Sequence, residues 1–109
     1  MEEEKSRLDY LRRLLDEDPA EPFLHYAVCL ELKKSGRGAT HAFRKLIQDF
    51  PQYLPAYYQA ALLLAEEGET SDAAALANEG IRLAESQSDL HALSELKGLR
   101  QNILAGEFD

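Results

Sequence analysis

The chain has 109 residues, of which 45% are hydrophobic, and this composition fits one globular domain. Twenty acidic side chains against twelve basic ones give a formal charge of −8, which disfavours nucleic acid as a partner because phosphate backbones would be repelled. The longest apolar run, residues 60–65, is far shorter than the roughly 20 residues that span a bilayer, and the acidic start lacks the features of a secretory signal. We therefore expect a cytoplasmic protein without a membrane partner.

Residues 3–17 are predicted to form the first helix. Its leucines recur at spacings of three and four residues, so they share one helix face that must pack against a neighbouring element. Pro19 follows shortly after the predicted end, where a helix cannot easily continue. The residues on this face are Leu8, Leu11, Leu14 and Leu15.

Two further helices are predicted at residues 22–35 and 38–49. Pro22 suits the first turn of a helix, where its missing N–H costs nothing. Gly36 and Gly38 then break the chain, and Pro51 ends the second of the two helices. This second helix carries the clearest amphipathic stripe in the sequence, formed by Ala39, Ala42, Phe43, Leu46, Ile47 and Phe50.

Three more helices are predicted after Pro51. Pro55 opens the first of them and Gly68 closes it, and the next runs over residues 71–84. Gly80 lies inside that helix, where glycine costs about 1 kcal/mol relative to alanine, so a neighbouring helix, expected to be the last one, should approach closely there. The last helix covers residues 89–104, with Leu90 among its inward-facing leucines, and residues 105–109 are expected to fray.

The sequence contains two copies of one pattern. An aromatic residue is followed by a small residue, a leucine and another small residue at fixed intervals, which is the pattern that two helices packed as a hairpin require. The period of about 34 residues lies within the range of about 20–50 residues that is typical of solenoid proteins. The matching pairs are Phe23 with Tyr57, Ala27 with Ala61, Leu30 with Leu64, Ala39 with Ala73, and Ile47 with Ile81.

On these residues the chain resembles the tetratricopeptide repeat family, whose unit is a helical hairpin of about 34 residues. The turn glycine Gly68 in the second copy and Pro51 after the first copy also match the family pattern. Two positions depart from it, because Lys34 stands where a turn glycine is expected and Glu85 replaces the closing proline.

The resemblance implies an all-α fold, a right-handed α-solenoid of helix-turn-helix repeats with about six helices. It implies a single domain over residues 1–109, in which residues 21–51 form the first repeat and residues 54–85 the second. Residues 3–17 are then a flanking helix, and residues 89–104 are a C-terminal capping helix with a polar outer face.

No catalytic or metal-binding motif is evident. His25, His41 and His91 lie far apart in sequence and lack the spacing of known metal motifs. His25 and Cys29 are four residues apart on one helix, but a Cys–His nucleophile also needs an orienting group and an oxyanion pocket. We interpret Cys29 as a packing residue, and we predict that the protein is not an enzyme and needs neither metal nor cofactor.

For function, the resemblance implies a protein-protein interaction module. In this family the first helices of the repeats line a concave groove that receives a peptide or a helix of a partner. The expected lining residues are apolar or aromatic and do not include the Lys and Asn of members that clamp a terminal carboxylate. They are Leu24, Val28, Tyr58 and Leu62, edged by Glu21, Glu31 and Glu66.

This apolar lining with acidic edges predicts a protein or peptide partner that has an apolar anchor and basic flanks, because opposite charges steer association. Tyr58 is the expected centre of binding. The alternative is a self-associating structural domain, in which a second copy of the chain buries the same face in a homodimer.

Overall fold

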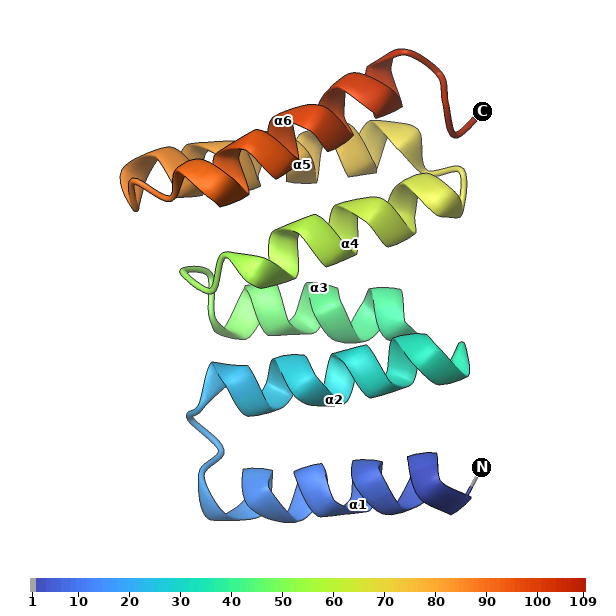
Figure 1. Ribbon diagram of the computed structural model, residues 1–109, viewed down its shortest axis with the longest axis vertical. Helices are drawn as coiled ribbons and strands as arrows, with labels where there is room; N and C mark the ends of the chain where they lie inside the picture. The colour runs from blue at the N-terminus through green and yellow to red at the C-terminus, as the bar shows by residue number, and fades with distance from the viewer. Residues whose placement is uncertain (1) are drawn as a thin grey trace. The chain divides into compact units, whose positions relative to one another are not determined.

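The computed structural model describes the backbone of residues 2–109 and the side chains of residues 7–109. Six helices and no strand occur in this part of the chain, which confirms the predicted all-α helical repeat fold (Figure 1). The chain divides into two compact units, the first ending at Phe50 and the second running from Pro51 to Asp109. The helices are α1 (Glu2–Glu17), α2 (Pro22–Ser35), α3 (Ala39–Asp49), α4 (Pro55–Glu66), α5 (Thr70–Ser86) and α6 (Leu90–Leu104).

Local signals in the sequence set several helix ends. Pro22 and Pro55 occupy the first positions of α2 and α4, as expected from their fixed φ. Gly36 ends α2 in the left-handed conformation, with φ of 69°, and its N–H closes the last turn of the helix. In the turn between α5 and α6, Ser88 has a φ of 56°, which is uncommon for a residue with a side chain.

In the second unit, α5 packs against both α4 and α6. The interface is built from small side chains, so the helix backbones approach one another closely and the larger leucines fill the remaining space. A group of fully or almost fully buried residues forms its core: Ala61, Leu64, Ala65, Ala73, Ala77, Leu99 and Ile103.

Gly80 is a point of close approach between the helices of this unit. A Cβ atom at this position would lie 2.9 Å from the Cβ of Tyr57 on α4 and 3.1 Å from the Cδ atoms of Leu96 on α6. The sequence predicted a close neighbour from α6, and the structure adds α4. Tyr57 is held in place by its hydroxyl, which donates to the carbonyl oxygen of Pro51 at 2.7 Å.

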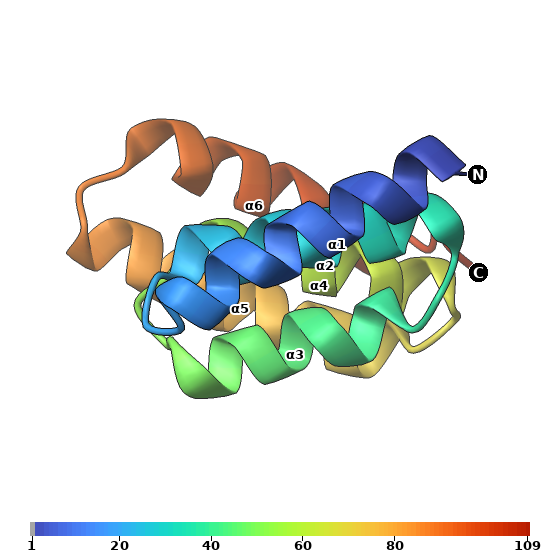
Figure 2. The ribbon, with the colours of Figure 1, turned by 90° about the horizontal axis from the view of Figure 1, so that it is seen from below.

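In the first unit, α1 packs against α2 and α2 packs against α3 (Figures 1 and 2). Phe23 and Tyr57 occupy equivalent positions in the repeat but differ in burial, because Phe23 is 59% exposed and Tyr57 only 6% exposed. Leu46 occupies the position equivalent to Gly80 and is itself buried, so the first unit has a large side chain where the second unit has none. Tyr26 contacts Phe43 edge-on instead, with the ring centres 5.9 Å apart.

The C-terminal end of the chain differs from the sequence expectation in two respects. Leu90, at the first position of α6, is 77% exposed and does not face inward. The residues after α6 fold back in a hydrogen-bonded turn, and Phe108 packs against the core of the second unit, so they are not a frayed tail. The cause is the packing of Phe108 against this core, which helical periodicity does not encode.

We predict opposite effects for alanine at the two helical glycines of the second unit. Gly80→Ala should lower the free energy of unfolding by about 1–3 kcal/mol, because the added Cβ meets Tyr57 and Leu96. Gly98→Ala is the matched control: a Cβ there meets nothing within 4 Å, so the better helix propensity should raise stability by up to about 1 kcal/mol. Urea denaturation followed by circular dichroism measures both, and equal effects of the two substitutions would contradict the close packing at Gly80.

Candidate functional site

The first unit holds four of the residues that the sequence assigned to a binding groove. Leu24 and Val28 are partly buried on α2, and neither is fully covered. Glu21 caps α2, because its carboxylate accepts a hydrogen bond from the backbone N–H of Phe23 at 3.0 Å. The fourth residue, Glu31, has a different environment.

The Glu31 carboxylate ties α1 to α2. Its side chain is only 10% exposed, and one oxygen lies 3.5 Å from the Nε of Arg7 on α1. The other oxygen is buried without a hydrogen bond, and its nearest cation is the Nζ of Lys34 at 3.9 Å. Burial of a carboxylate is tolerated when it is paired, so this contact helps to fix α1 on α2.

The second unit holds the other three residues. Tyr58 and Leu62 are partly buried on α4 and pack against the core of the unit, whereas Glu66 is exposed near the end of the helix. The acidic surface extends well beyond Glu66. This unit has ten acidic side chains, all of them exposed, and only three basic ones, so its surface attracts positive charge.

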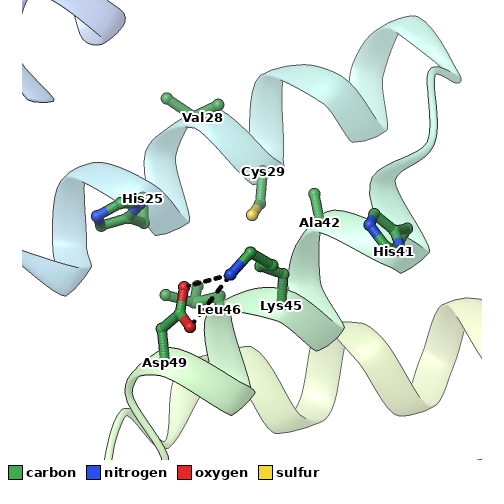
Figure 3. Close-up of a pocket in the computed structure, with 8 residues that line it drawn as sticks. All are labelled: His25, Val28, Cys29, His41, Ala42, Lys45, Leu46 and Asp49. Carbon is green, nitrogen blue, oxygen red and sulfur yellow. Dashed lines mark hydrogen bonds and ion pairs between the residues drawn. The ribbon is translucent and has the colours of Figure 1, made fainter.

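A pocket of about 220 Å³ lies between α2 and α3 in the first unit, and the sequence patterns did not predict it (Figure 3). The Nζ of Lys45 bonds both carboxylate oxygens of Asp49 at its rim, at 3.1 and 3.3 Å. At one end of the pocket, the Nε2 atom of His25 lies 2.8 Å from the carbonyl oxygen of Pro19. The lining residues are His25, Val28, Cys29, His41, Ala42, Lys45, Leu46 and Asp49.

The repeat itself contains the signal that could have revealed this pocket. Four of its lining residues are smaller or more polar than the leucines that occupy the same positions of the second repeat. A comparison of side-chain volumes between the two copies would have predicted open space. The four pairs are Val28 with Leu62, Cys29 with Leu63, Ala42 with Leu76, and Asp49 with Leu83.

The Cys29 thiol lines this pocket but is not set up for nucleophilic chemistry. Only 4% of the residue is exposed, and its burial raises the pKa of the thiol from 9.0 to about 11. A reactive cysteine needs a lowered pKa and an accessible sulfur, so Cys29 is a protonated packing residue at neutral pH, as the sequence predicted.

The described residues contain no group of three or more His, Cys, Asp or Glu side chains that could hold a metal ion. Among the helices of residues 2–109, none is both long and apolar enough to cross a membrane.

Two solved structures of a tetratricopeptide repeat domain protein from Salinibacter ruber are similar to the chain. The crystal structure shares 28% identity over 76% of this chain and 96% of that chain, with a TM-score of 0.73. The solution NMR structure shares 30% identity over 79% of this chain and 89% of that chain, with a TM-score of 0.74. No family model matches the sequence, and no curated protein does.

The raised pKa of Cys29 predicts a pH-dependent contribution to stability. Because the folded protein holds the thiol proton more tightly than the unfolded chain, this contribution is complete below pH 9.0 and is lost as the pH rises through about 11. The stability difference between the wild type and Cys29→Ala should therefore narrow over that range. The pKa of Tyr57 is also raised, mainly by burial and secondarily by the charge of Glu79, but it is common to both proteins and cancels.

Urea denaturation at a series of pH values measures this difference. A gap that stays constant from neutral pH to pH 11 would show that the Cys29 thiol ionises as freely in the folded protein as in the unfolded chain.

Proposed function

The chain belongs to the tetratricopeptide repeat family, and on that basis we propose that it binds a peptide or helix of a partner protein through α2 and α4, the first helices of its repeats. As a member of the family it is a protein-interaction module. The proposal names the surface of this chain that binds and the chemistry of the partner. It is supported chiefly by the incomplete burial of α2.

The apolar side chains of α2 are only partly covered. Cys29 alone is buried on this helix, whereas six residues are buried on α4, although both helices are rich in apolar side chains. Phe23 stands out with 59% exposure. Apolar side chains left open to water are a feature of protein-binding surfaces, because a partner that covers them removes apolar area from water. The partly buried apolar residues of α2, which lie all round the helix, include Leu24, Tyr26, Ala27, Val28, Leu30 and Leu32.

The charges of the second unit support a partner with basic flanks. Arg82 and Lys97 are the two exposed basic side chains among the described residues of this unit, and the third, Arg100, donates to the side-chain oxygen of Asn78 at 2.9 Å. Its ten exposed carboxylates outnumber these cations, so a Lys- or Arg-rich segment would be attracted to Glu66 and its neighbours near the end of α4. The proposed apolar contacts beside this charge are Tyr58 and Leu62, and the absence of Lys and Asn at these positions argues against a carboxylate clamp.

A homodimer is the second candidate. The same exposed ring of Phe23 and the same partly covered side chains of α2 could be buried by a second copy of the chain. The formal charge of −8 on each copy opposes this association, because the two chains repel each other. We therefore place it behind the binding of a basic partner.

Site-specific photo-crosslinking tests the surface directly. A photoreactive phenylalanine derivative at Leu24 or Tyr58 should form a covalent adduct with the partner in the cells that express the protein. The same derivative at Glu79, an exposed residue of α5, is the matched control and should form little or none.

The mass of the adduct separates the two candidates. An adduct of twice the chain mass of 12.3 kDa would favour the homodimer, whereas a heavier or lighter product identifies a different partner. Equal yields from Glu79 and from the two helix positions would refute the proposed surface. Tyr58→Ala should also reduce capture of the partner, with circular dichroism checking that the variant remains folded, since Tyr58 also contacts the core.

A further inference from the structure

We propose that the pocket between α2 and α3 is an anchor site for one uncharged aromatic side chain of the partner. This inference rests on the proposed function and deepens it by naming the group that the first unit recognises. The pocket has a volume of about 220 Å³, and a cavity of about 150 Å³ in another protein is known to hold a benzene molecule. The pocket is therefore large enough for one ring and too small for a drug-sized ligand.

The lining suits a ring better than an aliphatic chain. Val28, Ala42 and Leu46 provide apolar walls, and the sulfur of Cys29 points into the space between the helices (Figure 3). The imidazoles of His25 and His41 border it on either side, and aromatic rings attract each other in stacked or edge-on arrangements.

The charges at the rim favour an uncharged group. Lys45 and Asp49 neutralise each other through two hydrogen bonds, so the pocket offers neither a free cation nor a free carboxylate to a charged ligand. The complementary group is then a neutral ring, which the partner supplies as Phe, Tyr or Trp.

The second repeat shows how the pocket can be filled without disturbing the hairpin. Leucine stands at the positions equivalent to Val28 and Ala42, so Val28→Leu and Ala42→Leu copy side chains that the same fold already accommodates. Ala75→Leu, on the exposed face of α5, adds the same side chain away from the pocket and serves as the matched control.

A titration of the full chain with indole, followed by ¹H–¹⁵N NMR spectra, tests the site without any partner. We expect saturable shifts of the backbone amides of Val28, Cys29, Ala42 and Leu46. These shifts should be lost in Ala42→Leu and retained in Ala75→Leu, with the NMR spectrum showing that each variant is folded. If Ala42→Leu does not fold, Val28→Leu provides the same test.

Three results with indole would overturn the proposal: no saturable shift in the wild type, the same shifts in the filled variants, or equally strong shifts in the second unit. 3-Methylbutanol is the aliphatic probe and should bind severalfold more weakly, whereas equal binding would contradict the preference for a ring. Because indole replaces the partner, failure of this titration together with successful crosslinking at Leu24 and Tyr58 would remove the anchor site and leave the proposed function intact.

Discussion

The absence of a side chain at Gly80 is the constraint on which the packing of the second unit depends. It lets α5 lie against α4 at Tyr57 and against α6 at Leu96, with no room for even one methyl group. Close contact of three helices brings small residues such as Ala61 and Ala77 into the core, where they are completely buried. Tight packing of this kind is sensitive to added volume, since protein interiors have few voids.

The helices of the first unit pack with large and small side chains at different positions from those in the second unit. Leu46 replaces Gly80 and is buried, while the aromatic residue equivalent to Tyr57, Phe23, lies at the surface. Of the 19 buried hydrophobic residues recorded for the described part of the chain, five belong to this unit and 14 to the second. The volume that is missing beside Ala42 forms a pocket, and most apolar side chains of α2 stay partly open to water. The less completely packed half of the chain thus offers more apolar surface to a partner.

Features of the fold that depend on local chemistry could be predicted from the sequence. Pro22 and Pro55 mark helix starts through their fixed φ, Gly36 marks a helix end, and the pattern shared by the two copies indicates the repeat. Features that depend on which side chains meet across helices could not. Phe23 matches Tyr57 in the repeat, yet Phe23 is 59% exposed whereas Tyr57 is buried.

The candidate site shows the same division. The sequence places Leu24, Val28, Tyr58 and Leu62 on the first helices of the repeats, and the structure places all four on α2 and α4 in partly buried positions. The sequence could not indicate that Glu31 pairs with Arg7, because this contact depends on the packing of α1 against α2. The pocket was also missed, since it arises from the combined volumes of side chains on two helices.

Native-state hydrogen exchange, read residue by residue by NMR, tests most directly whether the second unit is the tightly packed half of the chain. Amides of α4, α5 and α6 should exchange more slowly than those of α1 and α2, because protection follows the stability of the local packing. Slower exchange in α2 than in α4 would contradict this assignment, and it would remove the physical reason for placing a partner on the incompletely covered helix α2.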